Sequence, residues 1–109
     1  MIENFEIEES SGNVFADLGV PSPEEALAKA QLASRICDII RERQLTQVEA
    51  AKVLGINQPK VSALMRGKLD GFSLDRLFRF LNALDQNVEI MIKPNLNPDE
   101  QAGLHIYSS

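Results

Sequence analysis

The chain has 109 residues, of which 44% are hydrophobic and 25% are charged, so it suffices for one small folded domain with some additional chain. Its formal charge of −5 argues against a protein that coats nucleic acid without regard to sequence. No apolar run approaches the roughly 20 residues that span a bilayer. The single cysteine, Cys37, excludes an internal disulfide and offers no metal-ligand cluster.

The charges are segregated along the chain. Residues 1–30 carry one basic and seven acidic side chains, residues 31–70 carry seven basic and four acidic ones, and residues 71–109 carry three basic and five acidic ones. Only the middle of the chain therefore carries a net positive charge, and such a segment is suited to contact the phosphates of a nucleic acid.

Residues 1–21 are predicted to form an acidic arm. The first ten, MIENFEIEES, are acidic where a secretory signal would be basic, so we expect a cytoplasmic protein. Phe5 and Ile7 alternate with glutamates, which is typical of a short edge strand. An arm that orders only on binding is the alternative.

A long helix is predicted to follow. Ser22 is a capping residue, Pro23 occupies the first turn and Glu25 follows at the third helical position. The helix should run to about Arg43, and Gln44 then stands where many helices end in glycine. Its inward face is expected to consist of apolar residues at helical spacing: Ala26, Ala30, Ala33, Cys37 and Ile40, widened by Leu32, Ile36 and Ile39. On this face Cys37 is expected to be a core residue rather than a redox site.

Two short helices joined by a tight turn are predicted between Leu45 and Lys68. Thr46 and Glu49 form a capping box, the apolar stripe Val48, Ala51 and Leu54 follows, and Gly55 suits a left-handed helix end. Asn57 then caps a second helix that runs to about Met65, with Val61 and Leu64 inward. This pattern is typical of a helix-turn-helix unit.

The last predicted elements are a helix and a strand. Ser73 caps a helix to about Leu84, with an inward stripe of Leu74, Leu77, Phe78, Leu81 and Leu84. Val88, Ile90 and Ile92 then alternate with Glu89, Met91 and Lys93, which predicts a strand ending at Pro94. A lone strand needs a partner for its backbone, either its symmetry mate in a two-fold dimer or the segment 5–8. We favour the dimer, so Val88, Ile90 and Ile92 are the predicted dimerisation residues.

The motif resembles a known family. The residues Gln47, Ala51, Gly55, Ile56, Gln58, Val61 and Leu64 are similar to the pattern of lambda-repressor-like (XRE) helix-turn-helix domains, and the wider string 14–94 resembles HigA-like antitoxins within them. The resemblance implies a mainly α-helical fold of four to five helices with one C-terminal β-strand. The expected organisation is an arm over 1–21, a DNA-binding domain over 22–86, a dimerisation strand over 87–94 and a flexible tail over 95–109.

The second motif helix would enter a major groove with its first residues nearest the base edges. Gln58, Lys60 and Ser62 are therefore the candidates for base readout, Gln58 because an amide can bond adenine N7 and N6 together. Pro59 replaces the small polar residue often found at this position in the family. The candidates for phosphate contact are Gln47, Asn57, Arg66 and Lys68, and Arg76 and Arg79 are weaker ones.

The predicted function is sequence-specific repression of transcription by a homodimer on a palindromic operator. The resemblance implies an antitoxin that represses its own promoter and binds a small basic ribonuclease toxin. The alternatives are a stand-alone or phage-type regulator without a toxin, and a protein-interaction module that does not bind DNA. The sequence shows no histidine paired with a nucleophile, no glycine-rich phosphate loop and no buried carboxylate pair, so we expect neither catalysis nor a cofactor or metal.

Overall fold

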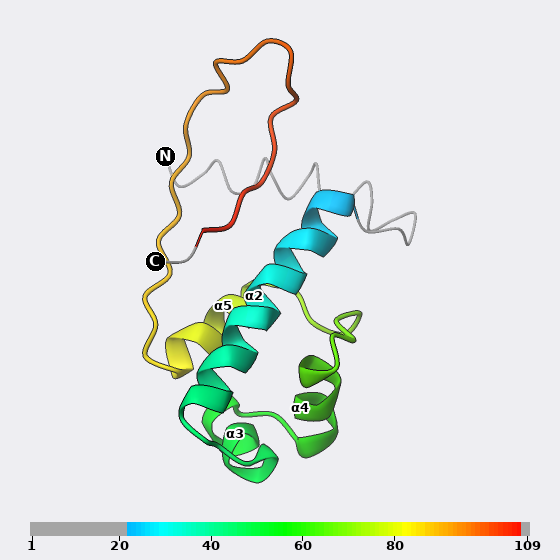
Figure 1. Ribbon diagram of the computed structural model, residues 1–109, viewed down its shortest axis with the longest axis vertical. Helices are drawn as coiled ribbons and strands as arrows, with labels where there is room; N and C mark the ends of the chain where they lie inside the picture. Colours follow the sequence, from blue (N-terminus) through cyan, green and yellow to red (C-terminus); the bar gives the residue numbers. More distant parts are fainter. Residues whose placement is uncertain (1–21, 108–109) are drawn as a thin grey trace.

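The computed structural model describes residues 22–107 of the chain, and this part contains four helices followed by a long segment without regular secondary structure (Figure 1). They are α2 (Pro23–Glu42), α3 (Gln47–Leu54), α4 (Gln58–Met65) and α5 (Leu74–Ala83). The long α2 packs against α4 and α5, and the short α3 packs against the same two helices. The predicted arm, with its edge strand at 5–8, lies outside the described residues.

Each helix begins where the sequence predicts, because a side chain caps its first turn. The Ser22 hydroxyl accepts the backbone N–H of the third helical residue at 3.0 Å, Asn57 Oδ1 does so at 2.9 Å and the Ser73 hydroxyl at 3.1 Å. The predicted capping box is complete, since Thr46 Oγ1 accepts the Glu49 N–H at 3.1 Å and Glu49 Oε1 accepts the Thr46 N–H at 2.8 Å. These bonds satisfy amides that have no partner within the helix.

The core is apolar and draws on all four helices, and the largest fully buried side chains are Ile36, Val61, Leu64, Leu77 and Leu84. Some predicted inward positions are wrong.

Val48 is 48% exposed, and its neighbour Ala50 is fully buried instead. Ala26 and Ala30 are exposed in the first turns of α2, which project beyond the other helices (Figure 1), whereas Ala28 between them is buried. The side chains that pack in α3 are Ala50, Ala51 and Leu54, two of them small enough for its neighbours to approach closely.

Two long-range hydrogen bonds fasten α2 to the ends of other helices. The Cys37 thiol lies 3.8 Å from the Leu64 carbonyl oxygen at the end of α4, and burial raises the pKa of this thiol, which fits the predicted core role. Arg43 Nη2 donates to the carbonyl oxygen of Leu84, directly after α5, at 2.6 Å. A guanidinium at the end of a helix satisfies carbonyls that have no partner within the helix.

The end of α2 adopts a left-handed conformation without glycine. Gln44 has a φ of 57°, and the following Leu45 N–H donates to the Ile40 carbonyl at 3.0 Å. Gln44 thus occupies the position where many helices have glycine, and a residue with a Cβ is destabilised there by about 1–2 kcal/mol.

Gln44→Gly is expected to raise the free energy of unfolding by about 1 kcal/mol, because glycine adopts the left-handed region without that penalty. Urea denaturation followed by circular dichroism measures the change. Gln31→Gly is the matched control, since Gln31 is exposed inside α2, where the same substitution should instead destabilise by roughly 0.5–1 kcal/mol. Equal destabilisation by both substitutions would contradict the prediction.

The strand predicted over 87–94 is not formed within the described residues. After α5 the chain runs outward, turns and comes back towards α2 without regular secondary structure (Figure 1). Residues 87–96 make no backbone–backbone hydrogen bond within the described chain. A strand exists only when its backbone pairs with another strand, and residues 22–107 supply none. The mainly helical fold is confirmed.

The returning segment meets the body of the molecule near its end. Ile106 is half-buried and packs against the core, whereas Leu104 is 45% and Tyr107 88% exposed. Among residues 22–107, no helix combines the length and the apolar character needed to cross a membrane.

Candidate nucleic-acid interface

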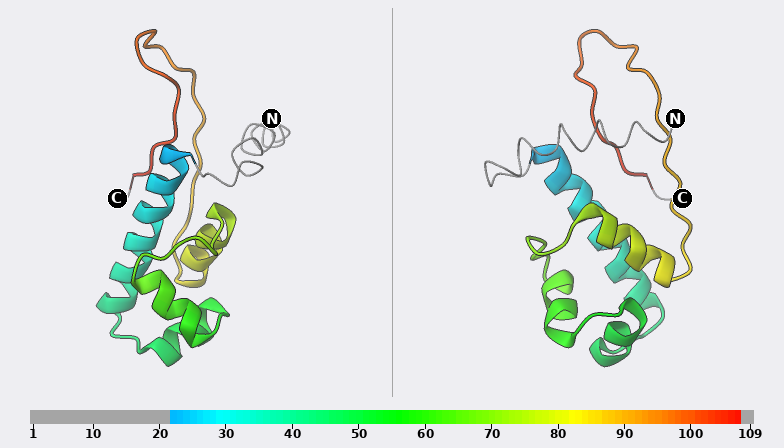
Figure 2. Two further views of the ribbon diagram at one scale, coloured as in Figure 1. Left: turned by 90° about the vertical axis from the view of Figure 1, so that its right-hand side faces the viewer. Right: turned by 180° about the vertical axis from the view of Figure 1, so that it is seen from behind.

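Helices α3 and α4 form a rigid corner that presents α4 at the surface. Gly55 joins them with a φ of 73°, and its N–H donates to the Ala51 carbonyl at 2.8 Å. Val61 and Leu64 anchor α4, with exposed fractions of 0% and 1%. The opposite face of α4 is therefore turned outward, along one side of the molecule (Figures 1 and 2).

The first turn of α4 carries the residues predicted to contact bases. Gln58 and Lys60 are exposed, Ser62 is half-buried, and the exposed Pro59 lies between the first two. An exposed amide at the first position of a helix can meet a base edge in a major groove, and a lysine beside it can reach guanine or a phosphate.

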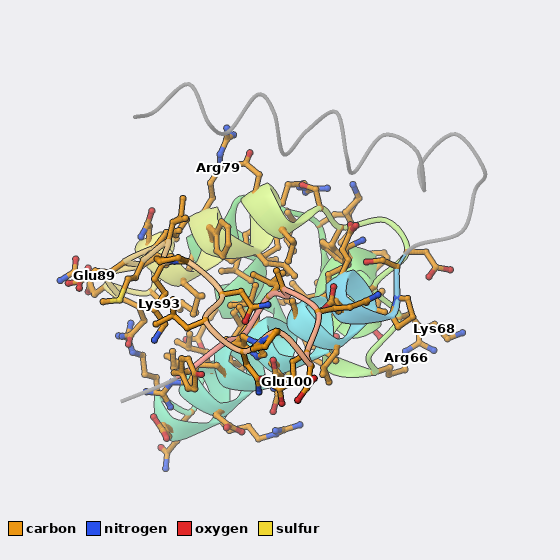
Figure 3. The ribbon with its side chains drawn as sticks, turned by 90° about the horizontal axis from the view of Figure 1, so that it is seen from above. Arg66, Lys68, Arg79, Glu89, Lys93 and Glu100 are labelled. Atoms are coloured by element: carbon orange, nitrogen blue, oxygen red, sulfur yellow. The ribbon has the colours of Figure 1, made fainter. Side chains whose placement is uncertain are left out.

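The cations on this side are not neutralised by carboxylates. Lys60, Arg66 and Lys68 are exposed and form no ion pair with any described residue, and residues 57–69 contain no acidic side chain. Arg66 Nε donates to the Ser62 carbonyl at 3.3 Å, which orients its guanidinium beside the end of α4. Figure 3 shows Arg66 and Lys68 projecting from the same edge of the molecule. This edge is suited to bind phosphate.

Several other basic side chains have partners within the protein. Arg79 Nη2 lies 3.0 Å from Asp75 Oδ2, and Arg35 and Arg41 also lie within 4.0 Å of carboxylates. The Arg76 guanidinium lies over the rings of Phe72 and Phe80, 5.4 and 5.6 Å from their centroids. These arginines differ in this respect from Lys60, Arg66 and Lys68, which have no such partner among the described residues.

Two further predicted phosphate contacts occupy helix starts. Gln47 is the exposed first residue of α3, beside amides that point out of the helix end. Asn57 uses its side-chain oxygen to cap α4, so only its amide NH₂ group remains for a ligand. Both residues are exposed at the surface, but their contact with phosphate remains a prediction.

The residues predicted to contact DNA thus lie on α3 and α4, at the start of α4 and directly after it, at Arg66 and Lys68. The predicted dimerisation residues lie elsewhere. Val88 is half-buried against the core, and Ile90 and Ile92 are 60% and 61% exposed. The segment that contains them runs along the side of the molecule away from α4, as Figure 1 and the right-hand view of Figure 2 show.

Comparison with known proteins agrees with this geometry. A family model described as a helix-turn-helix domain matches residues 14–93. The solved structure of a protein named as an XRE family transcriptional regulator is 45% identical to this chain, with a TM-score of 0.77, over 82% of this chain and 100% of that one. No curated protein matches the chain.

Proposed function

Because the chain belongs to the helix-turn-helix domain family and is a DNA-binding regulator of the XRE type, we propose that it represses transcription by binding a specific operator as a homodimer. The observation that carries the proposal is the first turn of α4, where Gln58 and Lys60 are exposed on a helix whose other face is anchored in the core. The α4 side chains would distinguish bases, and Arg66 and Lys68, which have no ion-pair partner among residues 22–107, would hold the phosphates.

A footprint on the DNA directly upstream of the gene tests this proposal. We expect a protected palindrome whose half-sites are one helical turn, about 34 Å, apart. Titration of salt should weaken binding steeply, because each neutralised phosphate releases counterions. A protein-interaction module built on the same scaffold would give neither a specific footprint nor a steep salt dependence.

Arg66→Ala should weaken binding to every DNA sequence alike and reduce the slope of log K against log salt by about 1, because one phosphate contact is lost. Fluorescence anisotropy with operator and scrambled duplexes at several salt concentrations measures both effects. Arg79→Ala is the control, since Arg79 is paired with Asp75 and projects from a different side (Figure 3). An unchanged salt slope in the Arg66 variant would remove this residue from the interface.

The proposal extends to an antitoxin that represses its own promoter. Its support is the resemblance of residues 14–94 to HigA-like antitoxins and the excess of acidic side chains over residues 1–30, which suits a small basic ribonuclease toxin. Co-expression with each neighbouring small gene tests this part. If neither product co-purifies with the chain or slows growth when expressed alone, the chain is a stand-alone regulator and the proposed DNA binding is unaffected.

A further inference from the structure

Residues 88–94 form a largely exposed segment whose backbone has no hydrogen-bond partner in the described part of the chain. The side chains of Ile90, Met91 and Ile92 are 60%, 83% and 61% exposed, and the backbone of this segment forms no backbone–backbone hydrogen bond within the described chain. Val88 packs against the core and fixes the start of the segment. An extended chain with free N–H and C=O groups is a template for another strand.

We propose that this segment pairs with the same segment of a second copy, antiparallel and centred on Met91. The inference rests on the proposed function, because it supplies the interface of the operator-binding homodimer. The first argument is charge: Glu89 and Lys93 stand two residues on either side of Met91. In the proposed alignment Glu89 faces Lys93 of the partner subunit, and the two-fold axis repeats the pair. Opposite charges directly across a strand pair stabilise it.

Other symmetric alignments do not match the charges. Directly opposed residues lie on the same face of a sheet, so the two-fold axis must pass through a residue rather than between two. An axis through Ile90 places Glu89 against the partner's Met91, and an axis through Ile92 places Lys93 against the same residue. Only the axis through Met91 pairs the two charges.

Pro94 fits the same alignment. Opposed residues of antiparallel strands alternate between hydrogen-bonded and non-hydrogen-bonded pairs. If Met91 faces its counterpart in a hydrogen-bonded pair, Glu89 and Lys93 are hydrogen-bonded as well. Pro94, which has no N–H, then falls opposite Val88 of the partner subunit at a position that requires no donor.

The apolar side chains are also placed consistently. Ile90 faces Ile92 of the partner subunit at a non-hydrogen-bonded position, where side chains approach most closely. Both isoleucines share a face with Val88, which packs against the core, and both are less exposed than Met91 on the other face. Pairing would therefore cover Ile90 and Ile92 while leaving Met91 and the charges at the surface.

Charge-exchange variants test the alignment by sedimentation equilibrium of the full chain, without DNA and at low salt. The wild type should dimerise, and Glu89→Lys and Lys93→Glu should each raise the dimer Kd about tenfold to a hundredfold, because both cross-strand pairs become like-charged. The double variant should regain the wild-type Kd, and an equimolar mixture of the single variants should form a heterodimer of wild-type affinity. Glu100→Lys, an exposed change of the same kind in the chain that follows this segment, should leave the Kd unchanged.

Other results would overturn the proposal. A wild type that stays monomeric removes the second copy as the occupant, and single variants that dimerise like the wild type remove the register. If the mixture of the two single variants associates much more tightly than the wild type, the strands are parallel, because each charge then faces the same position of the partner subunit and is repelled in the wild type. A monomer that still binds the upstream DNA specifically would leave the proposed operator binding standing and remove its homodimer, whereas a dimer that obeys the charge rules but binds no specific DNA would end the proposed function alone.

Discussion

Gln58→Ala is expected to weaken binding to the operator by about 1–3 kcal/mol, a loss of roughly fivefold to more than a hundredfold in affinity. The amide is exposed at the first position of α4, and alanine can form neither bond of a bidentate contact to adenine. Binding to scrambled DNA should be nearly unchanged, because it depends on the cations rather than on base contacts. Anisotropy titrations of both duplexes at one salt concentration give the two values.

A double-mutant cycle identifies the base that Gln58 contacts. Replacing the contacted base pair should weaken the wild-type protein but leave the Gln58→Ala variant unaffected, since the interaction is already absent. Gln31→Ala, an exposed change on α2, is the control and should bind both duplexes normally. Equal losses on operator and scrambled DNA would show that Gln58 supports phosphate binding or folding instead of base readout.

Leu64→Ala is expected to lower the free energy of unfolding by about 2–5 kcal/mol. Leu64 is 1% exposed and anchors α4 in the core, so its truncation leaves a cavity beneath the helix. A loss of that size is a large part of the roughly 5–15 kcal/mol that stabilises a typical domain. Urea denaturation at 25 °C, followed by circular dichroism, measures it.

The neighbouring Met65 supplies the comparison for this second prediction. Met65 is half-buried on the same helix, so Met65→Ala removes a side chain of similar size and should cost clearly less. If the two variants lose equal stability, or if Leu64→Ala loses less than about 1 kcal/mol, α4 is not anchored as the structure indicates.

The local features of this fold were predictable from the sequence, because their causes lie within a few residues. Each helix start is fixed by a capping side chain such as Ser22 or Thr46 that bonds an amide three residues later. The left-handed ends at Gln44 and Gly55 follow from the same neighbourhood. The exposure of Gln58 and Lys60 also follows, since Val61 and Leu64 set which face of α4 is buried.

Features that depend on distant residues were not predictable. The inward face of α3 is set by its neighbours, so Ala50 rather than Val48 is buried. The bond from Arg43 to Leu84 joins residues 41 positions apart, and no local pattern indicates it. The stacking of Arg76 over aromatic rings likewise removes a cation that composition alone counts towards a basic surface. Alternation marked the segment after α5 as a strand, but alternation does not say which chain supplies its partner.

The hydrogen bond between Arg43 and Leu84 has a consequence for operator geometry. Arg43 lies just before α3, and Leu84 lies just before the segment 87–94. Their hydrogen bond therefore connects the start of the helix-turn-helix with the start of the proposed pairing strand. In a two-fold assembly, any swing at this joint would change the distance between the two α4 helices. If the proposed dimer forms and this joint is stiff, the distance between the two α4 helices is fixed, and we expect weak binding to operators in which a single base pair has been inserted between the half-sites.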